Sequence, residues 1–432
     1  MLKSILAFSV FYLLPLLGST QIQYNRKLDQ YTTAYAAVYD FHGAVLMAKK
    51  NEIIFQKAFG YANREWSVKN TTDTRFPIAS LTKQFTAAAI LQLAEQGKLS
   101  VDDRLSKFFP GYPKGDSVTI HMLLNHTSGI KEYSQVPGLF QLNYTNELSK
   151  DTIIKLFQKL PFSFSPGSFW GYSNTGYILL GYIIEQITGE TYGDYIKKNI
   201  FQKAEMNNSG LFHQDTVTSK RAFGYTQTPA GIITQMVVPF KLGFSDGGLF
   251  STVEDLLNWN RALHSCNIIG KEYLSKMNQP NREEGGAGYG IFIDNMFDRK
   301  VRFHTGNIPG YSSVMLNYVE DDVTIIILAN KETNLDFFPR GIAAIMFDKD
   351  VVIPYPHKPF QLASENLQLY AGKFETVFPF EVIEKQGKLF MNIGRDIELV
   401  AESKTKFYVA EPDVDIQLEY VFNGQNCSPV LY

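Results

Sequence analysis

The chain has 432 residues, of which 45% are hydrophobic and 19% are charged, and its 41 Lys and Arg nearly balance its 43 Asp and Glu. This composition is ordinary for a globular protein, and the length allows more than one domain and a large core. The balance of charge and the lack of a sustained basic stripe exclude an electrostatic basis for binding nucleic acid or an anionic membrane.

The first segment, residues 1–20, is typical of a secretory signal peptide. Lys3 supplies a positive charge, an apolar run covers residues 5–17, and small residues follow. The run is too short to span a bilayer and is broken by Pro15. A buried N-terminal helix or an uncleaved anchor is the alternative. We therefore expect a periplasmic or secreted protein with no stable membrane insertion after signal cleavage.

The chain contains two cysteines, Cys266 and Cys427. They could form one disulfide in an oxidising compartment, and two free buried thiols are the preferred alternative. Neither belongs to a paired-Cys cluster, and the scattered histidines form no His-Glu-x-x-His pattern. We therefore expect no metal and no other cofactor.

Two apolar segments, residues 43–48 and 53–62, flank a polar turn and predict a β-hairpin. Downstream, an apolar approach that contains Pro77 leads to Ser80, and an Ala-rich run free of Gly and Pro follows as far as Gly97. Such a run predicts a helix that begins near Ser80.

Further helices are predicted from apolar spacing and from stop signals. They cover residues 120–124, residues 152–160, and residues 175–189, which end at a glycine. Ser251 or Thr252 can cap another helix that runs through Leu257 and Trp259.

The last part of the chain is predicted to be rich in strands. A strand end at residues 301–306 is followed by a hairpin of residues 313–318 and 323–328 that ends a sheet. Prolines at positions 354, 356 and 359 mark a linker. Beyond it, short alternating runs from residue 367 onward predict a small all-β domain.

Ser80 and Lys83 are three residues apart, which places them side by side on one helical face. A hydroxyl beside an amine is a candidate nucleophile beside its own base. The same pattern occurs twice more, at Ser128 with Lys131 and at Ser403 with Lys406. A glycine after the first of these spoils helix geometry, and the second lies between predicted strands, whose period of two separates its residues. Only the pair at Ser80 has a plausible helix.

Two further groups of polar residues lie where catalytic side chains concentrate. Tyr172 and Asn174 stand in a turn just before a predicted helix, and His304, Thr305 and Gly306 come at the predicted strand end. Each has an ordinary structural interpretation: a partly buried tyrosine beside a helix cap, or a solvent-facing histidine. The three motifs in this order are much more specific than any one of them.

In this order the motifs resemble those of the serine β-lactamase and penicillin-binding-protein superfamily, most nearly its class C and D-alanyl-D-alanine carboxypeptidase or esterase branch. The resemblance covers residues 32–353 and includes flanking segments at 60–62, 123–129, 172–177 and 247–249. It implies an α+β fold in which helices flank an antiparallel sheet, with an all-helical subdomain and a small C-terminal all-β domain.

The expected domains follow from the resemblance and the linker. A signal peptide of residues 1–20 precedes a hydrolase domain of residues 21–355, and residues 356–432 form the linker and the β-rich domain. That last domain resembles the small β-barrel-like domains appended to some peptidase relatives.

The resemblance also implies a role for each matching residue. Ser80 would be the nucleophile that forms an acyl-enzyme, and Lys83 would accept its proton if burial and the helix N-terminus favour the neutral amine. Tyr172 would relay protons to the leaving group and help activate the deacylating water. Asn174 would hydrogen-bond the substrate amide.

The remaining roles fall on the predicted strand end. His304 and Thr305 would face the substrate carboxylate, and Gly306 would lie on the same side of the substrate site. The backbone N–H groups of Ser80 and Asn307 would form the oxyanion hole.

One residue departs from the common pattern, because lactamases and carboxypeptidases of this superfamily usually carry Lys where His304 stands. A mostly neutral histidine holds a carboxylate less strongly than an ammonium does. We therefore expect a small-molecule or peptide substrate, such as a cell-wall peptide or an ester, with weak or no β-lactam hydrolysis. A penicillin-binding sensor or non-turnover binding module is the alternative, and the oligomeric state stays open.

Overall fold

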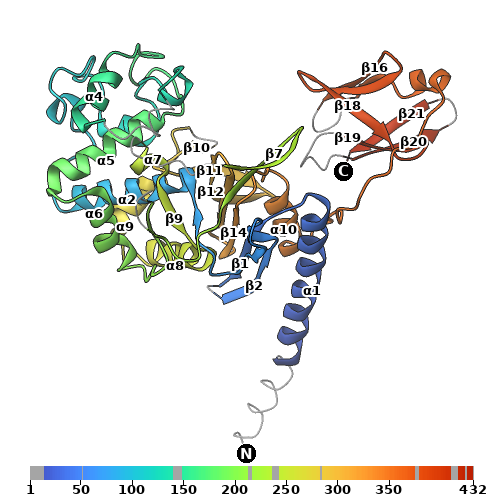
Figure 1. Ribbon diagram of the computed structural model, residues 1–432, viewed down its shortest axis with the longest axis horizontal. Coiled ribbons are helices and arrows are strands. Elements are labelled where there is room, and N and C mark those ends of the chain that lie inside the picture. Colours follow the sequence, from blue (N-terminus) through green and yellow to red (C-terminus); the bar gives the residue numbers. More distant parts are fainter. Residues whose placement is uncertain are drawn as a thin grey trace, which may run out of the picture. The chain divides into compact units, whose positions relative to one another are not determined.

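The computed structural model in Figure 1 describes residues 14–431 with short gaps. The residues outside the description are 1–13, 51, 140–147, 213–216, 236–242, 283–284, 375–378, 410–416, 424–425 and 432. The described chain forms two compact units. One extends from His42 to Thr333, and the other joins the residues up to Phe41 with those from Asn334 onward.

The larger unit is built on a seven-stranded antiparallel sheet in the order β10-β11-β12-β13-β14-β1-β2. Its strands are β1 (Gly43–Lys49), β2 (Glu52–Phe59), β10 (Gly286–Ala287), β11 (Phe292–Met296), β12 (Arg299–Ile308), β13 (Tyr311–Tyr318) and β14 (Val323–Ala329). Every residue of β13 and β14 is buried. These strands are therefore covered on both faces, which explains their nearly continuous apolar sequence.

Both predicted hairpins are confirmed, since β1 pairs with β2 and β13 pairs with β14. The second hairpin does not end the sheet, because β14 also pairs with β1, with Gly43 opposite Ala329. The predicted strand end at residues 301–306 is also corrected. β12 continues to Ile308, so His304 lies inside a strand.

Three small sheets complete the strands of this unit among the described residues. They are the pair β3 (Tyr61–Asn63) with β4 (Val68–Lys69), the set β5 (Phe76–Pro77), β9 (Leu249–Ser251) and β6 (Gly210–Leu211), and the pair β7 (Gly224–Thr228) with β8 (Gly231–Gln235). The middle set fixes the approach to Ser80, because Pro77 lies opposite Phe250 in its register.

The helices of the larger unit share one hydrophobic core with the sheet. They are α2 (Thr82–Glu95), α3 (Ile120–Leu124), α4 (Lys150–Gln158), α5 (Asn174–Thr188), α6 (Tyr192–Ile196), α7 (Phe244–Gly247), α8 (Val253–His264) and α9 (Lys271–Met277), with short 3₁₀ or π turns η1 (Ala79–Leu81), η2 (Leu105–Lys107), η3 (Tyr133–Gln135) and η5 (Lys197–Phe201). Figure 1 shows α4, α5 and α6 gathered in the helical part of the unit.

The helix predictions are confirmed in position. α3 has the predicted bounds, and α4 begins and ends two residues earlier than predicted. Gly189 ends α5 with φ of +71°, a left-handed conformation that glycine adopts without strain. Thr252 caps α8 by accepting a hydrogen bond from Asp255 N at 3.1 Å.

Residues 82–94 of α2 are all buried, so this helix is central to the core. The Phe85 ring on α2 packs 4.4 Å from the Trp259 ring on α8, and edge-on against Phe201 at 5.6 Å. Aromatic pairs at these distances stabilise the core beyond the area that they bury. The helix α2, which carries Lys83 and directly follows the turn with Ser80, is thereby packed against α8 and η5.

The smaller unit contains α1 (Leu14–Val38), α10 (Phe338–Met346) and η6 (Ser364–Leu369), followed by an all-β half-barrel. The ring of Tyr35 on α1 stacks on Phe338 of α10 with a centroid distance of 3.8 Å. The half-barrel is an antiparallel meander of β15 (Gly372–Phe374), β16 (Phe380–Lys385), β17 (Lys388–Asn392), β18 (Asp396–Ala401), β19 (Lys406–Val409), β20 (Gln417–Asn423) and β21 (Asn426–Leu431). It has its own apolar core, as the alternating sequence predicts.

Two expectations concern the chain termini and the cysteines. The predicted signal peptide falls largely on residues 1–13, outside the described residues, and no helix in the described part has the length and apolar character needed to cross a membrane.

Cys266 is a free and exposed thiol, so the expectation of burial is wrong for it. The side chain of Cys427 lies outside the description.

A buried histidine gives the stability of the fold a defined pH dependence. His264 on α8 contacts the carbonyl of Asn260 through Nδ1 at 2.8 Å, so Nδ1 carries the proton and Nε2 accepts from Arg302. Burial, reinforced by the Arg302 charge, lowers the pKa of His264 to about 4. The unfolded chain binds this proton near a pKa of about 6.5, so the His264 contribution to stability is lost as the pH falls from about 6.5 to 4.

Replacing His264 by Gln should therefore flatten the pH dependence of the free energy of unfolding between pH 4.5 and 6.5. The expected difference from the unchanged chain is at most about 1.4 kcal/mol per pH unit. Urea unfolding of both proteins at several pH values measures this difference. Other groups that titrate equally in the two proteins contribute nothing to it. Parallel pH profiles would contradict the assignment.

Candidate active site

Ser80 lies in η1, at the turn that leads into α2. Ala79 before it has φ of +47°, a left-handed conformation that is rare outside glycine and is often found beside functional residues. The turn is held because Ile78 N donates to Leu249 O at 2.9 Å and Leu81 N donates to Ile78 O at 3.2 Å. The backbone geometry thus presents Ser80 at a fixed position.

Lys83 lies in the first turn of α2 and is fully buried. Its Nζ donates to Ser80 Oγ at 3.0 Å, to Asn174 Oδ1 at 2.6 Å, and to the carbonyl oxygen of Asp246 at 2.7 Å. Three acceptors match the three N–H bonds of an ammonium. The spacing predicted from the sequence therefore does bring Ser80 and Lys83 into contact.

Tyr172 reaches the same oxygen, since its hydroxyl donates to Ser80 Oγ at 2.9 Å. Its ring lies 5.0 Å from Lys83 Nζ and 4.5 Å, between centroids, from the His126 ring. His126 Nδ1 accepts from the backbone N–H of Ser173 at 3.1 Å, which fixes the ring under Tyr172. Burial, together with the nearby Lys83, holds the pKa of His126 well below its usual value, so this support is neutral.

Asn174, the first residue of α5, is oriented by one hydrogen-bond donor and one hydrogen-bond acceptor. Its Oδ1 accepts from Lys83, while its Nδ2 donates to Glu132 Oε1 at 3.0 Å and its backbone N–H donates to Glu132 Oε2. Glu132 Oε1 also accepts from Ser134 N at 3.0 Å. The amide cannot be reversed without losing both contacts, and its second lone pair and second N–H remain for a substrate.

A second buried carboxyl group lies beside Lys83. Asp246 on α7 is buried, and its Oδ1 has no hydrogen-bond partner within the described residues. Burial raises the pKa of Asp246 to about 7; the Glu132 charge adds to this rise and the Lys83 charge opposes it. Asp246 is therefore poised between its neutral and charged forms near neutral pH.

These supporting residues, Glu132, Asp246 and His126, were not among the residues predicted from the sequence. His126 lies within one of the flanking segments of the resemblance, and Asp246 directly precedes another. Glu132 follows three residues after Gly129. The sequence signal that could have found them is their position beside these glycine-containing segments. However, the sequence of a turn does not show whether its carboxylate is buried or exposed.

The strand β12 forms the opposite wall. β11 pairs with β12 only from Arg299 to Phe303, so the edge of β12 beyond Phe303 is left to face the site. Gly306 lies against η1, where a Cβ would be 2.6 Å from Ile78 O and 2.9 Å from Ser80 N. Only glycine permits this approach, which brings the backbone of β12 close to Ser80.

His304 is held in one tautomer. Its Nδ1 lies 2.5 Å from the carbonyl oxygen of Thr305, a contact that requires the proton on Nδ1. Nε2 is buried and has no hydrogen-bond partner in the part of the chain that the structure describes. Burial, with a further contribution from the Lys83 charge, lowers the pKa of His304 to about 3. In this geometry Nε2 is an acceptor and offers no hydrogen bond to a substrate carboxylate.

The arrangement supports acyl transfer. A serine hydroxyl lies between an amine and a phenol within hydrogen-bonding distance, in the turn before α2 and next to a strand edge. The groups supplied by Ser80, Lys83, Tyr172 and Asn174 converge from η1, α2, a loop and α5. Within the described residues there is no cluster of His, Cys, Asp and Glu that could hold a metal ion.

Comparison with known proteins agrees with this geometry. Residues 28–347 match the beta-lactamase family. Penicillin-binding protein 4* of Bacillus subtilis (strain 168) is 30% identical over 414 residues, which cover 88% of this chain and 90% of that protein.

Solved structures show the same likeness. A penicillin binding protein from Bacillus halodurans is 32% identical, with a TM-score of 0.65 over 74% of this chain and 98% of that one. The octameric penicillin-binding protein homologue from Pyrococcus abyssi is 26% identical, with a TM-score of 0.69 over 94% of this chain and 98% of that one. This chain therefore belongs to the beta-lactamase family, within the serine-hydrolase superfamily of β-lactamases and penicillin-binding proteins.

Proposed function

We propose that the protein is a secreted or periplasmic hydrolase that acts through a Ser80 acyl-enzyme on peptide, amide or ester substrates, including peptides of the D-alanyl-D-alanine type. The observation that carries the proposal is the position of Ser80 Oγ, 3.0 Å from Lys83 Nζ and 2.9 Å from the Tyr172 hydroxyl. Both groups can exchange a proton with the serine oxygen, which acyl transfer requires.

In the proposed reaction the Ser80 oxygen bonds to the substrate carbonyl carbon, and the bond to the leaving amine or alcohol breaks. For this step the Lys83 ammonium first loses a proton to solvent, and the resulting amine accepts the serine proton and passes it to the leaving group. The backbone N–H groups of Ser80 and Asn307 stabilise the oxyanion, an effect of about 3 kcal/mol for each donor. Water then bonds to the ester carbonyl carbon while Tyr172 accepts a proton from the water and passes its own proton to the Ser80 oxygen. The bond between the acyl carbon and that oxygen breaks, which releases the acid and restores Ser80.

The preference for peptides and esters over β-lactams rests on His304. An ammonium at this position would attract a substrate carboxylate, whereas the neutral ring offers only a lone pair at Nε2. Relatives named as penicillin-binding proteins support acylation by β-lactams but do not imply rapid release of the adduct.

A penicillin-binding sensor is the second candidate function. It is favoured by the absence, within the described residues, of a carboxylate that hydrogen-bonds Ser80, because deacylation then depends on Tyr172 alone. A slow deacylation step would leave a long-lived acyl-enzyme.

A substrate panel separates these functions. D-Ala-D-Ala peptides and short-chain p-nitrophenyl esters should be turned over, and nitrocefin hydrolysis at pH 8 should be weak. A fluorescent penicillin should label the protein at Ser80, and the Ser80→Ala variant should lose both labelling and turnover.

The lifetime of the penicillin adduct then decides between the candidates. Release within minutes together with turnover of the panel supports the hydrolase, while a stable adduct without turnover supports the sensor. Fast nitrocefin turnover would contradict the preference assigned to His304, and labelling of Ser80→Ala would contradict the nucleophile.

Glu132 should matter for acylation although it does not contact Ser80. The Glu132→Gln variant replaces one accepting oxygen by an NH2 group, so Asn174 loses a charge-assisted partner. Such a loss is worth about 1.5–3 kcal/mol, so the rate of acylation by a fluorescent penicillin should fall about 10- to 100-fold.

The matched control is Glu190→Gln, which removes an exposed carboxylate that pairs with Lys198. Its acylation rate should equal that of the unchanged chain. Equal rates for Glu132→Gln and Glu190→Gln, with both proteins folded by circular dichroism, would show that Glu132 does not position Asn174.

A further inference from the structure

A second concave site lies outside the active site. It is formed by the β3–β4 hairpin on one side and by residues 217–223 on the other, and it has a volume of about 840 Å³. Pockets that bind small ligands or short peptides have volumes of about 300–1,000 Å³. Its lining residues are distinct from those that contact Ser80.

The walls of this groove are joined by backbone hydrogen bonds. Phe223 N donates to Ala62 O at 2.7 Å, and Arg75 N donates to Lys220 O at 2.9 Å. The turn that carries Trp66 is closed by a hydrogen bond from Trp66 N to Asn63 Oδ1 at 2.7 Å. The groove is therefore preformed, so a ligand need not order it on binding.

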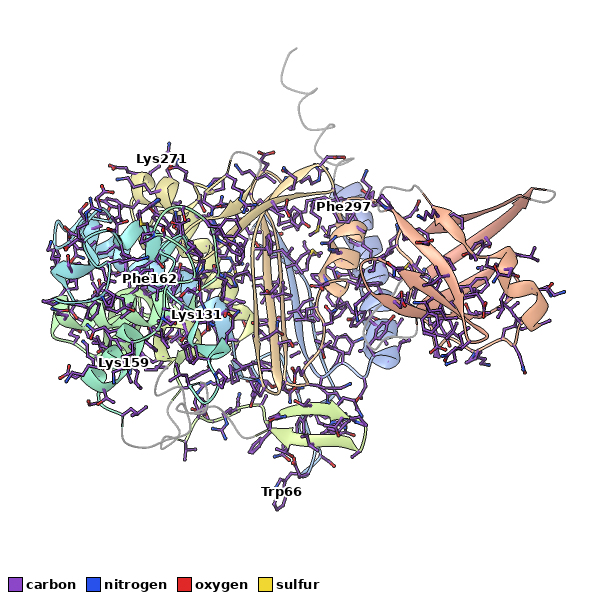
Figure 2. The ribbon with its side chains drawn as sticks, turned by 90° about the horizontal axis from the view of Figure 1, so that it is seen from above. Trp66, Lys131, Lys159, Phe162, Lys271 and Phe297 are labelled. Atoms are coloured by element: carbon purple, nitrogen blue, oxygen red, sulfur yellow. The ribbon has the colours of Figure 1, made fainter. Side chains whose placement is uncertain are left out.

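Four large apolar side chains that line this groove face solvent. Trp66 is 82% exposed, Val217 is 96% exposed, Val68 is 53% exposed and Phe223 is 38% exposed. Figure 2 shows the Trp66 side chain pointing away from the ribbon at the edge of the molecule. Single exposed apolar residues are common, but a group of them that includes a tryptophan around one groove marks a binding surface.

A guanidinium without a carboxylate partner lies in the same groove. The Arg221 guanidinium carbon is 5.2 Å from the Phe212 ring and 5.4 Å from the Phe223 ring, and its Nε is buried without a hydrogen-bond partner among the described residues. Within the described residues no acidic side chain pairs with Arg221, whereas its neighbour Lys220 pairs with Asp73. Contacts with ring faces leave the edge of the guanidinium for a planar anion.

The charge of the groove favours an anionic ligand. Its lining contains the cations of Lys69, Lys220 and Arg221 against the single carboxylate of Asp73. Among the described lining residues, only Arg221 combines a positive charge with hydrogen-bonding edges that no described side chain occupies. Lys220 is paired with Asp73, and the Lys69 ammonium lies 4.0 Å from the Tyr61 ring centroid. One such group matches one carboxylate and not a polyphosphate, which needs several cations.

We propose that this groove binds a peptide that carries a free carboxylate beside a large apolar side chain. Arg221 binds the carboxylate through two parallel N–H bonds, and Trp66 and Val217 cover the apolar side chain. The rest of the groove accommodates the peptide backbone. The groove is a peptide-binding site separate from the catalytic serine, and it does not depend on the reaction proposed for Ser80.

The test uses the full chain with Ser80→Ala, so that no probe is consumed. The probes are acetyl-Ala-Ala-Phe with a free carboxylate and the same peptide with a C-terminal amide, titrated by calorimetry and by tryptophan emission. Trp259 is fully buried, Trp170 lies beside His126 in the active site and Trp66 is exposed, so only a change in emission that Trp66→Phe removes reports on the groove. The free acid should bind at least about 10-fold more tightly than the amide, the amount typical of a charge-assisted hydrogen-bonded pair.

Variants assign the effect to individual residues. Arg221→Gln should weaken binding of the free acid to the level of the amide, and Arg221→Lys should give an intermediate affinity because it keeps the charge without the planar fork. Trp66→Ala should weaken both peptides. Leu369→Ala, which changes an apolar residue that is 58% exposed in the other unit, is the matched control and should have no effect.

Each outcome supports or overturns the proposal. Equal affinities for acid and amide, no binding at millimolar peptide, or unchanged affinity in a folded Arg221→Lys or Trp66→Ala variant would overturn it. Binding of phenylacetate as tightly as the peptide would overturn the peptide assignment and identify a small aromatic acid as the ligand. Thermal unfolding of each variant shows whether it is folded.

Discussion

The active site depends on one buried cation. Lys83 is taken out of water in the core of the larger unit, and an unpaired charge there would be strongly destabilising. Its three acceptors come from η1, α5 and α7, so the same contacts that satisfy the ammonium also fix these elements relative to one another. Glu132 extends the network by holding Asn174, and Asp246 lies next to it as a carboxyl group that is only partly ionised near neutral pH.

A buried cation also explains why the nearby imidazoles are neutral. Burial is the main reason that the pKa values of His126 and His304 lie below the usual range, and the Lys83 charge acts in the same direction on both. The two neutral imidazoles, of His126 and His304, have different roles in the site. His126 supports Tyr172, while His304 presents a lone pair on the wall formed by β12, where a lysine would add a second positive charge to a site that already contains one.

Much of the fold could be predicted from the sequence, because its signals are local. The hairpin of β1 and β2, the bounds of α3, the glycine that ends α5 and the threonine that caps α8 all follow from short-range patterns of apolar, turn and capping residues. The pairing of β1 with β14 could not be predicted in this way. Two buried apolar strands are compatible with many partners, and only the closed sheet selects one.

For the site, the sequence by itself determined which residues could take part. Helical spacing placed Lys83 beside Ser80, and the motif order singled out Tyr172, Asn174 and the residues His304 to Asn307. Tertiary structure alone decided how they are held. The contacts with Glu132, His126 and Asp246, the tautomer of His304 and the approach of Gly306 to Ser80 join residues distant in the chain. Burial and hydrogen bonding of this kind arise only when the helices and the sheet pack together, so no local pattern encodes them.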